Sequence, residues 1–438
     1  MKKLVFILIV LFFTTAYSQG NSRPSGNIIE AAMPLSSLKA SGMDSVYIYS
    51  KIDSIVTQGI KEEAFPGAQL LVAKEGKIIF HETYGFHTYD SLQAVAKSDI
   101  YDLASVTKIT GPLPALMKLV DEGKIDLDVP FSTYWKPWKR RKDKKDLTLR
   151  EILAHQAGLE PYIIFLDRVM KKERFKKRFL QRIKSDHFQV QAYEGIYVKN
   201  RFKNKMHRII NRSEVNKDKT YRYSGLTFLI FPEIIAQLSG KDYETYVREN
   251  FYEPLGCNTM GFNPSSWQVP NRIVPTEEDT LYRKTLTKGW VHDENASLLG
   301  GVSGNAGLFA TAEDLARLMQ MYQNYGLFNG KRYLSERTLK EFIRVQYPEN
   351  ENRRGLGFDK PLLNNSDLDI SEAYPAPEAS TESFGHSGFT GTFAWADPKN
   401  QLVFIFLSNR VHPSRTHRKL YSLNIRTTLQ QVFYKALP

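Results

Sequence analysis

Cysteine is almost absent from this 438-residue chain, and its scarcity excludes two kinds of site. Because Cys257 is the only cysteine, no disulfide can form within the chain and no group of thiolates can bind a metal ion. The nine histidines are scattered and lack the H-x-x-x-H spacing of a helical metal site. The sequence also lacks the glycine-rich loop with a following Lys-Ser/Thr that cradles phosphates. We therefore expect no metal.

Long apolar runs are also scarce. The apolar run Leu4–Phe13 has ten residues, which is short of the roughly 20 that a transmembrane helix needs. Two lysines precede it and small residues follow it, so residues 1–18 are predicted to be a signal peptide, cleaved before Gln19. An uncleaved anchor is the alternative. We expect a periplasmic or secreted protein, with residues 19–44 as an N-terminal lead-in and no transmembrane segment in the mature chain.

Acidic residues are too few to balance the basic ones. The chain has 60 Lys and Arg against 47 Asp and Glu, and most of the excess lies in Lys136–Arg150, Arg168–Lys184 and Lys199–Arg212. Apolar residues interleave with these charges at nearly helical spacing. The basic patch 136–212 is therefore either a solvated helical face or a surface for an anionic envelope partner, such as phospholipid, lipopolysaccharide or cell-wall polymer. No nucleic-acid-binding module is visible, and we expect no nucleic acid as a partner.

The order of predicted elements indicates an α+β fold with two lobes. Strand-like runs occur near both ends of the chain, at 68–84 and 392–407, and helical patterns lie beside them. One antiparallel sheet assembled from both ends and flanked by helices explains this order. We predict an α/β sheet lobe from residues 45–130 and 292–438, and an inserted, mainly helical lobe with a basic insertion from residues 131–291.

Ser105 and Lys108 form the most informative pair. They stand three residues apart, so one helical turn places both side chains on the same face. A serine hydroxyl is a poor nucleophile until a neighbouring base takes its proton. Lysine acts as that base only when burial or nearby positive charge lowers its pKa. The pair is a candidate nucleophile and base, although this spacing alone also recurs by chance.

Further motifs make the chain resemble the serine β-lactamase-related hydrolases, which include class C β-lactamases, penicillin-binding D,D-peptidases and related esterases. The similarity runs in order from about Val46 to Ser408. The segments that carry it are Leu103–Lys108 (S-x-x-K), Leu147–Leu159, Tyr221–Ser224 (resembling Y-x-N), Pro254–Gly256, Gly300–Leu308 and Gly385–Gly388 (resembling K-T-G or H-x-G). The resemblance implies a β-lactamase/transpeptidase-like fold and a reaction that needs no cofactor.

The resemblance also implies roles for particular residues. Ser105 would attack a carbonyl and become an acyl-serine, while Lys108 and Tyr223 would exchange the proton with the leaving group. Lys108 and the imidazole of His386 would favour the phenolate of Tyr223. The backbone N–H groups of Ser105 and Phe389 would form the oxyanion hole. His386, Ser387 and Gly388 would form the strand along which the substrate lies, with Gly388 leaving room for it.

The sequence departs from the family pattern at Gly225, where the second motif ordinarily ends in Asn or Asp, and at Asn305, where related sequences often carry His. The long basic stretch between His155 and Tyr223 is a lid over the cleft or a docking element. Three functions remain open: a peptidase or amidase acting on cell-wall peptide or β-lactam substrates, an esterase of small acyl esters, and a catalytically weakened protein that holds an anionic polymer.

Overall fold

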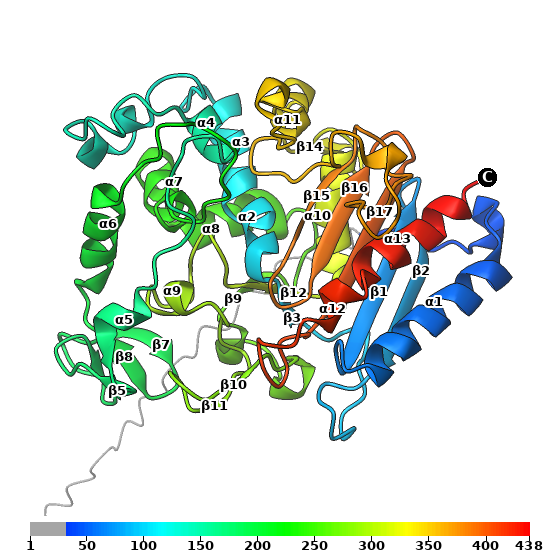
Figure 1. Ribbon diagram of the computed structural model, residues 1–438, viewed down its shortest axis with the longest axis horizontal. Helices are drawn as coiled ribbons and strands as arrows, with labels where there is room; N and C mark the ends of the chain where they lie inside the picture. Colours follow the sequence, from blue (N-terminus) through cyan, green and yellow to red (C-terminus); the bar gives the residue numbers. More distant parts are fainter. Residues whose placement is uncertain (1–31) are drawn as a thin grey trace, which may run out of the picture.

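The computed structural model describes residues 32–438, so the predicted signal peptide and the first part of the lead-in lie outside the described residues. The chain forms two lobes, and residues near both ends of the described chain build the same lobe (Figure 1). In the described part of the chain, no helix is both long enough and apolar enough to cross a membrane.

A five-stranded antiparallel sheet is the centre of the first lobe. Its strand order is β15-β16-β17-β1-β2, so a hairpin from the beginning of the chain pairs with three strands from its end. Leu71 lies opposite Ile405, and His386 lies opposite Ala394. The predicted sheet from both ends of the chain is confirmed. Its strands are β1 (Gly67–Lys74), β2 (Lys77–Gly85), β15 (Phe384–Ser387), β16 (Phe393–Asp397) and β17 (Leu402–Ser408).

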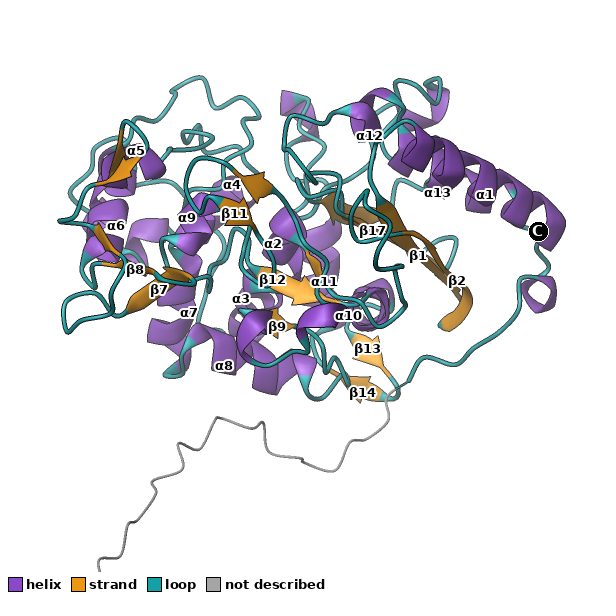
Figure 2. Ribbon diagram, turned by 90° about the horizontal axis from the view of Figure 1, so that it is seen from below, coloured by secondary structure: helices purple, strands orange, loops and turns teal. Residues whose placement is uncertain are grey.

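Helices cover both faces of this sheet because β1 is apolar on both sides. Leu70 and Val72 belong to one core cluster, while Leu71 and Ala73 belong to the other, as the alternation of side chains along a strand requires. Helices α1 (Ser45–Lys61) and α13 (Ile425–Lys435) pack on the first face, and α10 (Ala312–Gln323) packs on the opposite face (Figure 2).

The second lobe combines short helices with small antiparallel ladders (Figure 1). Its helices are α4 (Leu149–Leu153), α5 (Leu166–Val169), α6 (Phe202–Arg212), α7 (Phe231–Ser239), α8 (Tyr243–Val247) and α9 (Glu294–Ser297). Its strands are β4 (Met170–Lys171), β5 (Arg174–Phe175), β6 (Leu180–Gln181), β7 (Val190–Tyr193), β8 (Ile196–Val198), β10 (Glu278–Asp279) and β11 (Thr285–Leu286).

The helical spacing read from the segment 168–184 is wrong for most of that segment. Only its first two residues belong to a helix, α5, and the chain then turns back on itself as the β4–β5 hairpin. Lys172 and Glu173 form the turn with positive φ angles of 46° and 58°, a conformation that a helix does not contain. Pairing with the next strands stabilises this segment more than its weak helical periodicity does.

Strand β3, which belongs to a short three-stranded sheet with the order β3-β12-β9, directly precedes the predicted nucleophile. After β3, a helical turn contains Ser105, α2 contains Lys108, and the chain breaks at Gly111 before α3 begins at Pro112. The elements not yet given are β3 (Tyr101–Asp102), β9 (Gly261–Phe262), β12 (Leu308–Ala310), β13 (Leu327–Phe328), β14 (Lys331–Arg332), α2 (Thr107–Thr110), α3 (Pro112–Asp121), α11 (Glu336–Ile343) and α12 (Lys419–Ser422).

Candidate active site

A cavity of about 640 Å³ brings together residues from three of the predicted motifs. Ser105, Lys108, Tyr223 and Phe389 all line it. His386, Ser387 and Gly388 do not line the cavity, although they precede Phe389 directly. The remaining lining residues are Ala104, Pro161, Tyr162, Ile164, Leu166, Asp167, Gly225, Leu281, His292, Asp293, Glu294, Asn305, Ala306 and Arg415.

Ser105 and Lys108 are in direct contact in this cavity. The Nζ atom of Lys108 lies 2.9 Å from Oγ of Ser105 and also donates a hydrogen bond to the backbone carbonyl of Asn305 at 2.9 Å. The lysine side chain is buried, with 3% of its surface exposed. The Lys108 amine is therefore held between two neutral oxygens, the Ser105 hydroxyl and the Asn305 carbonyl. The motif residue Asn305 contacts the lysine through its backbone rather than its side chain.

A strained residue directly before Ser105 shapes the turn that presents it. Ala104 has a φ of 46°, a left-handed conformation that costs an alanine of the order of 1 kcal/mol. The buried carboxylate of Asp102 offsets this cost, because it accepts hydrogen bonds from Ala104 N at 2.8 Å and from His292 N at 2.7 Å. This strain could not be predicted from the sequence, because alanine is not a residue type that favours positive φ.

Tyr223 is positioned by His155, a motif residue for which we had predicted no role. The N–H of Ser224 donates to Nδ1 of His155 at 3.2 Å, and the N–H of Arg222 donates to its carbonyl at 2.9 Å. The rings of His155 and Tyr223 are 4.5 Å apart between centroids. Burial lowers the pKa of His155 well below its usual value, so its ring is neutral. Among the described residues, Oη of Tyr223 is buried without a hydrogen-bond partner.

The third motif packs tightly against the nucleophile segment. Thr390 and Thr392 donate hydrogen bonds through their hydroxyls to the carbonyls of Asp102 and Leu103, at 2.7 Å and 2.9 Å. A Cβ atom on Gly388 would lie only 2.0 Å from Oγ1 of Thr392 and 2.5 Å from the carbonyl oxygen of Leu103. Gly388 therefore has a structural reason besides the predicted room for substrate: only glycine allows this close approach.

The imidazole of His386, which we expected to favour the phenolate of Tyr223, has no positive charge with which to do so. Burial, reinforced by Arg354 and Lys108, lowers the pKa of His386 to about 3. Its Nδ1 lies 2.7 Å from the carbonyl of Ser387, so Nδ1 carries the proton and Nε2 is left as an acceptor. The ring stays neutral because it is buried among cations.

Arg354 is the charged neighbour that sequence reasoning missed. Its guanidinium carbon lies 5.2 Å from the centroid of the Tyr223 ring, and the residue is 4% exposed. Burial opposes its charge, but Asp359, Tyr221 and Tyr223 together raise the pKa of Arg354, so it stays charged. The loop that carries Arg354 belongs to none of the recognised motifs, and only the fold brings it to this site.

A second buried charge cluster lies at the mouth of the cavity. Arg415 reaches Oε2 of Glu277 with Nε at 2.8 Å, and His292 Nε2 lies 2.9 Å from the same oxygen. Burial alone would raise the pKa of Glu277, but the hydrogen bonds from His292 and Arg415 outweigh it and hold the pKa well below its usual value. The cluster fixes two lining residues, His292 and Arg415, and the ring of His292 stacks on Phe389 at 5.8 Å.

Gly225 leaves open space beside Lys108. Outside its chain neighbours, the nearest atom that a Cβ at this position would meet is Cε of Lys108, 4.0 Å away. The N–H of Gly225 donates to the carbonyl of Pro161 at 3.1 Å. The departure from the second motif is therefore a missing side chain in a position that could hold one. Within residues 32–438, no group of three or more His, Cys, Asp or Glu side chains is arranged to hold a metal ion.

Comparisons with known proteins agree with this architecture. The chain is 29% identical over 398 residues to a Salmonella agona protein named "Putative D-alanyl-D-alanine carboxypeptidase", covering 85% of this chain and 84% of the relative. A penicillin-binding protein homologue from Caulobacter crescentus superposes with a TM-score of 0.60 at 18% identity, covering 89% of this chain and 98% of the other.

A second solved structure, the D-amino acid amidase of Ochrobactrum anthropi SV3, has a TM-score of 0.59 at 15% identity, covering 88% of this chain and 97% of the other. These structural similarities show a β-lactamase/transpeptidase-like fold. The family model described as Beta-lactamase matches residues 52–427. The chain therefore belongs to the Beta-lactamase family.

Proposed function

We propose that this protein is a serine hydrolase that cleaves ester or amide substrates through an acyl-serine. The observation that carries the proposal is the 2.9 Å contact between Ser105 Oγ and a buried Lys108 Nζ at the edge of a 640 Å³ cavity. A nucleophile within hydrogen-bond reach of its base is the arrangement that covalent catalysis needs.

The proposed reaction follows from the positions of these groups. Oγ of Ser105 attacks the substrate carbonyl carbon while its proton moves to Nζ of Lys108, and the N–H groups of Ser105 and Phe389 stabilise the oxyanion. The proton taken by Lys108 moves on through the hydroxyl of Tyr223 to the departing alcohol or amine, and the acyl-serine forms. Water then attacks the acyl-serine, giving its proton back through the same groups, which releases the acid and restores Ser105.

Esters are the favoured substrates of this proposal. Gly225 offers no side chain to bridge Lys108 and the amide of a peptide or β-lactam substrate, and an ester depends less on such a bridge. The similarity to a carboxypeptidase-named relative supports a D,D-peptidase as the second candidate. A secreted or periplasmic location stays part of the proposal, on the evidence of the sequence pattern in residues 1–18.

A labelling experiment tests the proposal. A fluorophosphonate probe should modify wild type at Ser105 alone, as mapped by mass spectrometry, and should not label Ser105→Ala. Fluorescent penicillin in a parallel reaction distinguishes a β-lactam-reactive enzyme from an esterase. Equal fluorophosphonate labelling of both proteins would refute the assignment of the nucleophile. A correctly folded wild type that reacts with neither probe would favour the catalytically weakened binding protein.

A further inference from the structure

A cationic cleft in the second lobe carries charge that the protein itself does not neutralise. The cleft has a volume of about 680 Å³. It is lined by Arg168, Arg201, Asn204, Lys205, Arg208, Ile209 and Arg212. In residues 32–438, none of its five cations forms an ion pair, whereas Lys203, on the same helix, pairs with Glu233. Within the described chain, the cleft is therefore a part of the basic patch whose cations have no carboxylate partner.

Four of these cations lie on helix α6 or directly before it, and Arg168 lies on helix α5. Residues 201, 205, 208 and 212 recur at the spacing that puts them on one helical face, while Phe202, Met206 and Ile210 are buried on the other. The ring of Phe179 lies 4.2 Å from Nζ of Lys205. Burial, followed by the charges of Arg178, Arg168, Lys176 and Arg208, lowers the pKa of Lys205, which shows how closely the cations crowd.

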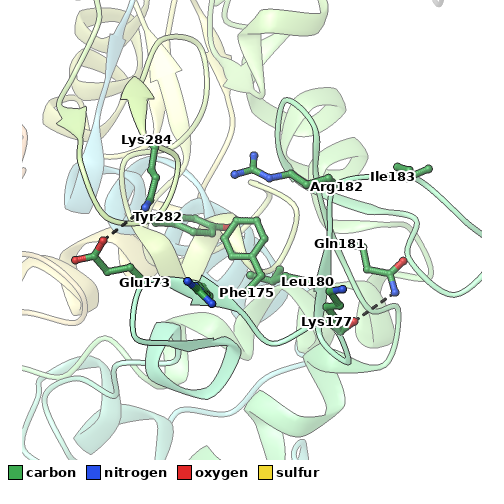
Figure 3. Close-up of a pocket in the computed structure, with 10 residues that line it drawn as sticks. Glu173, Phe175, Lys177, Leu180, Gln181, Arg182, Ile183, Tyr282 and Lys284 are labelled. Carbon is green, nitrogen blue, oxygen red and sulfur yellow. Dashed lines mark hydrogen bonds and ion pairs between the residues drawn. The ribbon is translucent and has the colours of Figure 1, made fainter.

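A neighbouring cavity of about 570 Å³ in the same insertion is less suited to an anion (Figure 3). It contains its own carboxylate, Glu173, which lies 3.6 Å from Nζ of Lys284, and much of its wall is apolar. Arg182 lies over the ring of Phe175 at 4.7 Å. The cleft on α6 has no such internal anion, so its charge is available to a ligand.

We propose that the cleft on α6 binds an anion that carries two or more phosphate groups. Four arginines offer planar forks that match phosphate oxygens, and one lysine adds a point charge. A concave site suits a compact phosphorylated group, either free in solution or displayed as a lipid headgroup. Within the basic patch 136–212, the proposal thus names one binding site, the cleft on α6, and one class of ligand, an anion with two or more phosphate groups.

Tripolyphosphate and orthophosphate are the probes for this proposal, measured by calorimetry at low salt. We expect tripolyphosphate to bind at least tenfold more tightly than orthophosphate, and the affinity to fall as salt rises. The variant Lys205→Glu/Arg208→Glu should lose at least tenfold in affinity. The control variant Lys171→Glu/Lys172→Glu makes the same change in net charge at an exposed hairpin outside the cleft and should bind like wild type.

Several outcomes decide the proposal. Equal losses in the two variants, each with an unchanged melting curve, would show that net charge rather than the cleft attracts phosphate. No binding at low salt would also overturn the proposal. A vesicle arm, with and without cardiolipin as a lipid that carries two phosphate groups, separates the two sources: vesicle binding that tripolyphosphate competes away indicates a lipid headgroup, while tripolyphosphate binding without vesicle binding indicates a soluble ligand.

An independent observation concerns the charge around Tyr223. Both neighbouring histidines, His155 and His386, have pKa values lowered by burial and are neutral. Asp359 is shared by two arginines, with its Oδ1 at 2.9 Å from Arg353 Nη2 and 3.6 Å from Arg354 Nε. One carboxylate between two guanidinium groups leaves a net positive charge beside the tyrosine ring.

We infer that Arg354 is a positioning residue that holds a positive charge beside the Tyr223 ring and so stabilises the negative charge that develops on the tyrosine oxygen while it relays a proton. This inference rests on the proposed function. Arg354 does not line the cavity, so it acts through the tyrosine rather than on the substrate. Its Nη1 is buried and unpaired among the described residues, and its Nε lies 3.3 Å from the hydroxyl of Tyr221.

The kinetics of ester hydrolysis test this inference. Removing the guanidinium takes away a positive charge beside the Tyr223 ring, so kcat should fall by about tenfold or more in Arg354→Gln while KM changes by less than about threefold. Arg354→Lys, which keeps the charge, should restore much of the wild-type kcat. The control Arg353→Gln removes the other partner of Asp359 but leaves Arg354 beside Tyr223, so its kcat should stay close to that of wild type.

An unchanged kcat in folded Arg354→Gln, or an equal loss of kcat in Arg353→Gln, would overturn the role of Arg354. Fluorophosphonate labelling of Ser105 keeps this outcome separate from failure of the proposed function. If wild type labels at Ser105 but kcat does not fall in Arg354→Gln, only the inference about Arg354 fails. If Arg354→Gln does not fold, the kcat of Arg354→Lys compared with that of Arg353→Gln decides the question.

Discussion

Gly225→Asn is the substitution that most directly tests how the second motif sets substrate choice. The cavity has room for the new side chain, because the nearest atom to an added Cβ is Lys108 Cε at 4.0 Å. The backbone of Gly225 lies outside the left-handed region, so asparagine fits without strain. The amide oxygen, two bonds beyond Cβ, is then placed to reach Nζ of Lys108, and the amide nitrogen can donate to a substrate carbonyl.

One recovered hydrogen bond to a charged or strained partner sets the expected size of the effect. Such a bond contributes about 1.5–3 kcal/mol, which corresponds to roughly ten- to a hundredfold in rate. We expect wild type to cleave p-nitrophenyl acetate or butyrate readily and nitrocefin poorly. Gly225→Asn should raise kcat/KM for nitrocefin by about tenfold or more while changing the ester rate much less.

Stopped-flow absorbance with both substrates provides the assay, and Gly225→Ala is the matched control. The alanine variant removes the flexibility of glycine but adds no hydrogen-bonding group, so it should keep the wild-type preference for esters. A melting curve confirms that each variant is folded. A folded Gly225→Asn with unchanged selectivity, or a wild type that already hydrolyses nitrocefin faster than esters, would refute this account of the second motif.

Two further predictions concern stability. Glu277→Gln should lower the free energy of unfolding by about 2 kcal/mol at pH 7, because it removes a buried charge held by Arg415 and His292. Since the folded-state pKa of Glu277 is depressed, this contribution is fully present above the unfolded pKa of about 4.3 and is lost progressively as pH falls toward the folded-state pKa. The gap between the two proteins in urea titrations should therefore narrow steadily as pH falls below about 4, and a constant gap would count against the ion cluster. Ala104→Gly should be neutral or raise the free energy of unfolding by up to about 1 kcal/mol, because glycine accepts a φ of 46° without strain; a loss of 1 kcal/mol or more would contradict the assignment of strain to Ala104.

Local sequence patterns predicted those parts of the fold that depend on neighbouring residues. The strands predicted within 68–84 and the contact of Ser105 with Lys108 follow from spacings of two or three residues. The helical prediction for the segment 168–184 was wrong because the apolar spacing there is weak and because Lys172 and Glu173 form a turn with positive φ angles. Neither residue type favours that conformation, so tertiary pairing decides the structure there.

Contacts between distant segments could not be predicted in this way. The sequence predicts that Gly388 leaves room for substrate along a strand, whereas the structure places it against Leu103 and Thr392. Its neighbours are set by how the strand and the nucleophile turn meet, more than 280 residues apart in the chain. A motif therefore identifies which residues belong to the site. Why a given residue type is required at a position depends on contacts with segments outside the motif.

The electrostatics of the site show the same contrast between residues inside the motifs and residues outside them. The motifs supply the hydroxyl, the amine and the phenol, but the charge that governs them comes from elsewhere. His386, the motif residue expected to favour the phenolate of Tyr223, is neutral because burial and the nearby Arg354 and Lys108 lower its pKa to about 3. Arg354 stays charged because Asp359 pairs with it. Protonation states follow from burial and from all neighbouring charges together, so the same motif can operate with a different charged residue when a loop outside it brings one close.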